Sequence, residues 1–252
     1  MFSPEGGPSP ESQELQPNLH IEDHYADFLP EEFTRDPKKY IEEHGVNFKS
    51  GDIQYHDDGS IREDPTASKF LPEWQNAQGE TIQAVSKKVN MEKVRTGTTS
   101  AGEKFADPLL EYKMMALCRV LDLPAAKPIG FVNQGGNMFT LMEQVQGYTW
   151  TRRDKDVLGQ EGLTAEDQES IREQIEDLMS ELKTQFDEFG IYRTWKHKDM
   201  VVELDTDNKK VNNITPVDWE KSHLDVDKLT QRIASFSPEQ QQEILDLVSL
   251  KT

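Results

Sequence analysis

Charged side chains of the kind that bind phosphate and divalent cations are concentrated between Gly190 and Glu220. Arg193 and Asp199 lie in a polar stretch, and Asp218 lies between apolar residues further on. Cationic side chains bind phosphate oxygens, and carboxylates are the ligands that hard cations such as Mg²⁺ prefer. The pattern predicts a loop, an apolar strand, a tight turn, a second strand, and then an acid at the end of that strand.

Two short segments in this region resemble motifs of one superfamily. YRTWKHKD, which ends at Asp199, resembles the catalytic loop H-R-D-L-K-x-x-N of protein kinases, with Arg193 and Lys196 matching the pattern. PVDWE (Pro216–Glu220) resembles the metal-binding D-F-G segment, which often reads I-D-W-E in the aminoglycoside phosphotransferase-like branch. The chain therefore resembles the protein-kinase-like superfamily over about residues 68–225.

An upstream strand and helix extend the resemblance. The stretch AVSKK contains two adjacent lysines, and alternation along a strand lets only one of them face a pocket. Lys87 shares its face with Val85 and Val89, so we assign Lys87, rather than Lys88, to the nucleotide phosphates. In kinase-like proteins, a helical carboxylate fixes the direction of this lysine, and the resemblance implies that Glu111 on the next predicted helix would take that role.

The segment MFTLMEQVQGYTW (residues 138–150) resembles the strand and hinge of aminoglycoside phosphotransferases and choline kinases. In those proteins, backbone groups of the hinge bind the adenine edge, which here corresponds to Glu143 to Val145. The resemblance as a whole implies an ATP and Mg²⁺ site. Its nucleotide-binding residues would be Lys87, Glu111, Glu143, Val145 and Lys196, and its metal ligands Asp199 and Asp218.

The catalytic loop departs from the kinase pattern. Thr194 occupies the position of the catalytic aspartate, and a threonine cannot act as a general base near neutral pH. His197 is the other titratable group nearby that could accept a proton. Asp199 replaces the metal-binding Asn, a G-x-G-x-x-G phosphate loop is absent, and the segment after Asp218 is short. We therefore expect a pseudokinase that binds nucleotide, or an atypical phosphotransferase.

Composition limits the other classes of function. The net charge is −19, and residues 1–66 alone contain 16 acidic and 5 basic residues. Such a chain repels nucleic acid and anionic membranes, so neither is an expected partner. The single cysteine, Cys118, excludes an intrachain disulfide. The sequence lacks an apolar run long enough to span a membrane and has no signal peptide at its start, so we expect a cytoplasmic protein.

Periodicity predicts an α+β protein with a two-lobed, kinase-like fold. Two strands are expected about a turn near Asn76 to Gly79, a helix from a cap at Asp107, and a long amphipathic helix from a capping box at Thr164 to Gly190. A small antiparallel sheet forms the expected N-lobe, and the C-lobe is short and mainly helical. The expected divisions are a disordered acidic tail (1–18), an extension with a short helix and a hairpin (19–66), the N-lobe (67–147) and the C-lobe (148–252).

A rival hypothesis is an adaptor without a nucleotide site. Its acidic N-terminal arm would bind a basic protein partner or fold on contact with one. His20 and His24 have the i, i+4 spacing of a metal pair, but we expect them in a disordered acidic stretch and therefore do not predict a zinc site.

Overall fold

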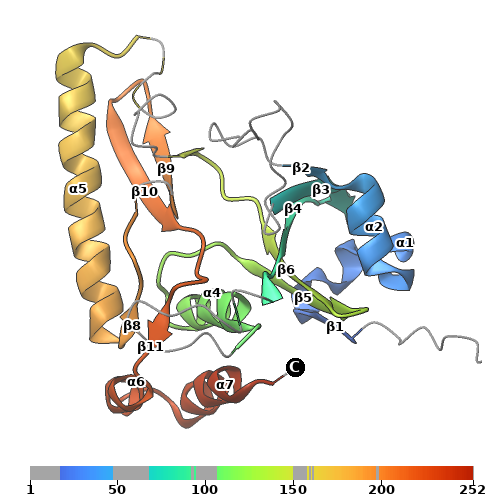
Figure 1. Ribbon diagram of the computed structural model, residues 1–252. Helices are drawn as coiled ribbons and strands as arrows, with labels where there is room; N and C mark the ends of the chain where they lie inside the picture. Colours follow the sequence, from blue (N-terminus) through green and yellow to red (C-terminus); the bar gives the residue numbers. More distant parts are fainter. Residues whose placement is uncertain are drawn as a thin grey trace, which may run out of the picture.

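The computed structural model describes residues 18–47, 68–91, 94, 107–149, 158, 160, 162–196 and 199–251 (Figure 1). The expected α+β class is confirmed, because the main sheet has six antiparallel strands with helices on either side. In spatial order the strands are β1 (Asn18–Ile21), β5 (Pro128–Gln134), β6 (Asn137–Glu143), β4 (Thr81–Lys88), β3 (Ser68–Gln75) and β2 (Val46–Asn47).

The β3–β4 hairpin forms where the sequence predicts it. The side-chain oxygen of Asn76 accepts hydrogen bonds from the amides of Gln78 and Glu80, and Gly79 adopts a φ of 85°. An Asx turn followed by glycine reverses the chain in this way. The hairpin fixes the register of β4 and places Lys87 opposite Ser68 on one side and Thr140 on the other.

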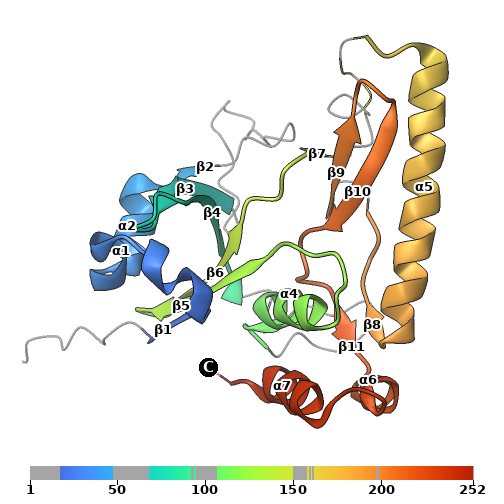
Figure 2. The same cartoon turned by 180° about the vertical axis from the view of Figure 1, so that it is seen from behind.

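The N-terminal segment is part of the sheet and its core. After β1 come the 3-10 helix η1 (Asp23–Phe28) and the helices α1 (Glu31–Arg35) and α2 (Pro37–His44). Asp36 caps α2 by accepting the Lys39 amide, and Pro37 is the first residue of that helix. α1 and α2 cover one face of the sheet, where Phe33 packs on Trp74 with 5.0 Å between ring centroids (Figure 2).

Two expectations for this segment need correction. Asn18, assigned to the disordered tail, pairs with Asn133 at the sheet edge, and His20 lies in β1 rather than in a disordered stretch. The glycine at 130 makes this pairing possible, because a Cβ there would clash with the carbonyl oxygen of His20. The hairpin expected around residues 56–60 lies outside the described residues.

The second half of the chain consists of helices around two small antiparallel sheets. Its helices are α5 (Ala165–Glu188), α6 (Val226–Ile233) and α7 (Pro238–Ser249), and α4 (Leu110–Val120) precedes them in the first half. One small sheet has three strands in the order β10 (Lys210–Pro216), β9 (Met200–Asp205) and β7 (Tyr148–Thr149). The other pairs β11 (His223–Leu224) with β8 (Ile191–Tyr192). The predicted capping box at Thr164 begins α5, which lies along β10 in Figures 1 and 2.

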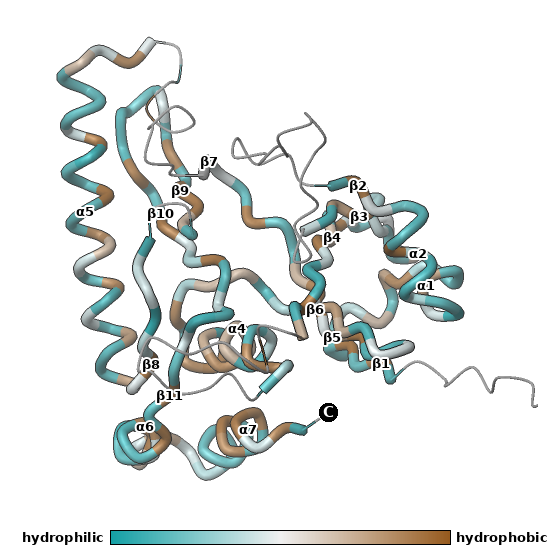
Figure 3. The backbone as a smooth tube through the Cα atoms, viewed as in Figure 1, coloured by the Kyte–Doolittle hydropathy of each residue, from teal (hydrophilic) through white to brown (hydrophobic). Residues whose placement is uncertain are grey.

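Helix α4 links the two halves and positions the site. It begins at Leu110 rather than beside Asp107, whose carboxylate instead accepts the Leu109 amide. Apolar residues cover most of its surface, as the brown stretch in Figure 3 shows, and it packs against β5, β6 and α7. Helix α6, whose N-terminus is capped by Asp225 accepting the Lys228 amide, was not predicted. No helix in the described ranges is long and apolar enough to cross a membrane.

Candidate functional site

Lys87 is the centre of a charged cluster between the sheet and the helical half. Its side chain is buried on β4, whereas that of Lys88 is exposed, as strand alternation predicts. The Lys87 ammonium lies 2.9 Å from Glu111, 2.7 Å from Asp218 and 3.5 Å from Glu220. Burial alone lowers a lysine pKa, but these carboxylates outweigh it and raise the pKa of Lys87 above its ordinary value.

Glu111 is supplied by α4 and is itself buried. The helix must dock closely to bring this carboxylate inward, and the neighbouring Tyr112, Met114 and Met115 are all buried in doing so. Oε1 of Glu111 accepts hydrogen bonds from Lys87 and from the Trp219 amide, at 3.3 Å. Burial raises the pKa of Glu111, and Lys87 opposes that shift.

Asp218 follows β10 and has a left-handed backbone with a φ of 63°. Few non-glycine residues adopt this conformation outside sites that hold the backbone in place. Its side chain remains 42% exposed although it bonds to Lys87, so one edge of the carboxylate faces outward. Burial raises the pKa of Asp218, but Lys87 dominates and the net pKa lies below its usual value.

Arg193 holds the backbone that carries Asp218. Its buried guanidinium donates to the carbonyl oxygen of Val217 at 2.8 Å and reaches those of Asp218 and Asp199 at 3.4 and 3.5 Å. It also stacks over the ring of Trp219, 4.5 Å from the centroid. The sequence pattern matched Arg193 to the catalytic loop, but its contact with carbonyls of two separate loops depends on the fold.

The structure brings the two predicted metal ligands onto adjacent loops. The amide of Val217, the residue just before Asp218, donates a hydrogen bond to the carbonyl oxygen of Asp199 at 2.8 Å. Asp199 is buried, whereas Asp218 is partly exposed, so the two acids differ in their access to solvent. Among the described residues, no group of three or more His, Cys, Asp or Glu side chains could hold a metal ion alone.

The remaining loop residues are not all joined to the cluster. Thr194, which the resemblance aligns with the catalytic aspartate of kinases, is exposed. Trp195 instead packs edge-on against Phe186 in the core. Lys196 is half-buried, and its side chain forms no hydrogen bond or ion pair with a described residue. His197 lies outside the described residues.

The predicted hinge leads directly out of β6. The side chain of Glu143 accepts a hydrogen bond from Tyr25 of the N-terminal segment at 2.6 Å, and it pairs with Lys127, just before β5, at 3.3 Å. The backbone amides of Glu143 and Gln144 are bound by the carbonyls of Lys127 and Gln83. Within the described part of the chain, the next amide, that of Val145, donates no hydrogen bond, so it can serve a ligand.

Glu220 is the site residue that sequence reasoning missed. The motif D-W-E was recognised, but only its first acid was assigned a role. Trp219 points into the core and is fully buried, so Asp218 and Glu220 on either side of it both reach Lys87. The alternation of acid, buried aromatic and acid was a usable signal for a second carboxylate. No family model matches this chain, and no curated protein matches it in sequence.

Proposed function

We propose that the protein binds a nucleoside triphosphate together with a divalent cation in a two-lobed, kinase-like fold. The observation that carries this proposal is the convergence of Lys87, Glu111 and Asp218 from a strand, a helix and a loop that are far apart in sequence. A buried lysine directed by one carboxylate, next to a second carboxylate with an outward edge, suits binding of phosphate and metal together.

The order of the elements supports the two-lobed part of the proposal. The lysine strand β4 is followed by the glutamate helix α4, then by the strands β5 and β6 and the hinge segment. A long helix, a loop, the β9–β10 hairpin and the acid at 218 come next, in the order that the resemblance implies. The N-lobe would be the six-stranded sheet, and the C-lobe would be α5 to α7 with the small sheets.

The negative charge around Lys87 explains why a divalent cation would be needed for phosphate binding. Three carboxylates surround one ammonium group, so added phosphate would meet repulsion unless a cation accompanied it. Mg²⁺ commonly uses only one or two protein carboxylates together with phosphate oxygens and water. The partly exposed, ionised Asp218 fits that requirement, with Asp199 on the adjacent loop as the second ligand. When bound, the cation would neutralise phosphate charge.

The missing base favours binding over efficient transfer. Thr194 is exposed and offers no carboxylate where a kinase places its aspartate. Phosphoryl transfer depends mainly on positioning and charge stabilisation, so a low transfer rate is compatible with the site. We therefore propose a pseudokinase or a weakly active phosphotransferase, with the backbone near Val145 binding the base and Lys196 close to the phosphates.

Thermal unfolding with and without millimolar ATP and Mg²⁺ tests this function. A ligand that binds only the folded state stabilises it by about 2.7 kcal/mol at a concentration of 100 Kd. We expect the wild type to melt at a higher temperature with ATP and Mg²⁺, and Asp218→Asn to lose that increase. Lys88→Met should keep it, because Lys88 is the exposed neighbour of the site lysine. An unchanged melting temperature of the wild type at saturating ATP would contradict the proposal.

A further inference from the structure

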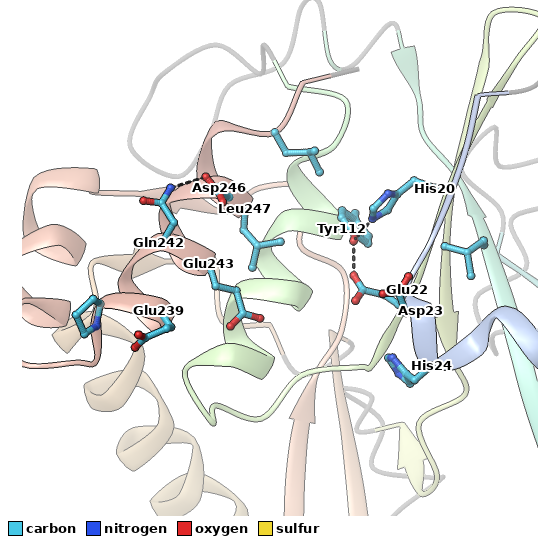
Figure 4. Close-up of a pocket in the computed structure, with 13 residues that line it drawn as sticks. His20, Glu22, Asp23, His24, Tyr112, Glu239, Gln242, Glu243, Asp246 and Leu247 are labelled. Atoms are coloured by element: carbon cyan, nitrogen blue, oxygen red, sulfur yellow. Dashed lines mark hydrogen bonds between the residues drawn. The ribbon is translucent and has the colours of Figure 1, made fainter.

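A groove separate from the Lys87 cluster lies between the N-terminal segment, α4 and α7. It encloses about 940 Å³ and is lined by residues of β1 and η1 on one side, by α7 on the other and by Tyr112 of α4 between them (Figure 4). The three elements come from residues 18–28, 110–120 and 238–249, so the groove exists only in the folded chain.

Both walls of the groove are acidic. Glu239, Glu243 and Asp246 recur along one face of α7, and Glu22 and Asp23 lie on the opposite wall (Figure 4). No lysine or arginine lines the groove among the described residues. Two bases lie outside the lining: Lys113 pairs with Asp107 at 2.6 Å, and Arg119 contacts the lining residue His24 at 3.2 Å. The acids of the groove walls are therefore not neutralised by basic side chains of the groove itself.

The groove also has apolar surface, and the ring of Tyr112 at its base is held in place by hydrogen bonds. Leu247 of α7 and Leu250, which follows the helix, contribute apolar side chains to the lining, together with the ring of Tyr112. The Tyr112 hydroxyl donates to Glu22 and lies 2.8 Å from Nε2 of His20, as the dashed lines in Figure 4 show. His20 is in turn stacked on Phe131, 5.0 Å between ring centroids. These contacts fix the tyrosine ring and shape the groove without an added ligand.

We propose that this groove binds a lysine- or arginine-rich segment of a partner protein in which apolar residues alternate with the basic ones. Acidic walls on both sides complement such charges, and the aliphatic stems of lysine and arginine can cover the apolar lining. Nucleic acids and anionic lipids carry the wrong charge for these walls. The proposal does not depend on nucleotide binding, because none of the lining residues named here belongs to the Lys87 cluster.

Fluorescence anisotropy with a labelled peptide tests the groove. The peptide has about 12 residues, with leucines recurring three and four positions apart and lysines at the other positions. The matched protein variants remove two charges each. Glu239→Gln with Glu243→Gln changes the groove wall, and Glu176→Gln with Glu181→Gln changes exposed acids on α5, outside the lining. A second peptide keeps the lysines and replaces every leucine by serine, and unlabelled spermidine serves as a competitor.

The groove variant should bind the lysine–leucine peptide about five- to tenfold more weakly than the wild type, because two opposed charges are lost. The α5 variant should stay within about twofold. Three results would each overturn the proposal: equal weakening by both variants, equal affinity for the serine peptide, or displacement of the peptide by an equal concentration of spermidine. Absence of peptide binding at low salt would overturn it as well.

Discussion

The carboxylate of Glu111 and the ammonium of Lys87 lie 2.9 Å apart, although the two residues belong to different layers of the molecule. The same Glu111 oxygen accepts the Trp219 amide. One buried carboxylate therefore joins a strand of the main sheet, helix α4 and the loop after β10. The position of α4 and the direction of Lys87 are set together, and disturbing either residue should affect both stability and the site.

Replacing Lys87 by Met should lower the free energy of unfolding by about 3–5 kcal/mol, because Glu111 would remain buried without its counter-charge. Urea denaturation at neutral pH measures this change. Lys88→Met, one residue away on the exposed face, should change it by no more than about 0.5 kcal/mol. Similar values for the two variants would mean that the Lys87 ion pairs contribute little to holding α4 in place.

Arg193→Lys should lower the free energy of unfolding by about 2 kcal/mol while keeping the positive charge. Lysine cannot reproduce the planar contact with Trp219 or the simultaneous reach to the carbonyls of Val217 and Asp218. Near-ultraviolet circular dichroism should also change, because Trp219 would lose its stacked partner. A variant as stable as the wild type, with an unchanged spectrum, would show that charge alone accounts for the role of Arg193.

Local sequence signals accounted for the elements that depend on nearby residues. The turn near Asn76 and the Thr164 capping box each act within a few positions, and both are present. The pairing of β1 with β5 could not be foreseen, because it joins Ile21 to Gly130 across the chain and has no local signature.

Phe33→Ala should destabilise the protein by about 3–5 kcal/mol, because Phe33 is fully buried between Tyr40 and Trp74. Urea denaturation again provides the measurement, and Thr34→Ala, at an exposed position in the same helix, provides the control. A loss below about 1 kcal/mol for Phe33→Ala would contradict the finding that the N-terminal segment shares the core of the sheet.

His24 should titrate with a pKa below 6.5. Burial lowers its pKa first, and the adjacent Arg119 lowers it further. The folded state therefore binds this proton less tightly than the unfolded state does. The contribution of His24 to stability is fully present above about pH 6.5 and is lost as the pH falls through the folded pKa.

A histidine titration by NMR measures this shift directly. Arg119→Gln should raise the pKa of His24 toward 6.5, and His24→Gln should make stability less dependent on pH in the same range. A pKa at or above 6.5 in the wild type would show that neither burial nor Arg119 acts on the ring as the geometry indicates.

At the charged cluster, the residue types were foreseeable and their contacts were not. Strand alternation selected Lys87 over Lys88, and the resemblance selected Glu111 and Asp218. Long-range packing decides the remaining contacts. It directs the Glu143 side chain toward Tyr25, and it buries Trp219, which places Glu220 beside Lys87. Loop residues such as Lys196 were assigned by pattern alone.

Isothermal titration of ATP into the protein, with Mg²⁺ and then with EDTA in its place, tests the central claim most directly. We predict saturable binding with Mg²⁺ and at least about tenfold weaker binding without it, because the carboxylates around Lys87 repel uncompensated phosphate. Lys87→Met and Asp218→Asn should each weaken the Mg²⁺-dependent binding, and Lys88→Met should not. Absence of binding by the folded wild type, or equal affinity in Lys87→Met, would contradict a nucleotide site at this cluster.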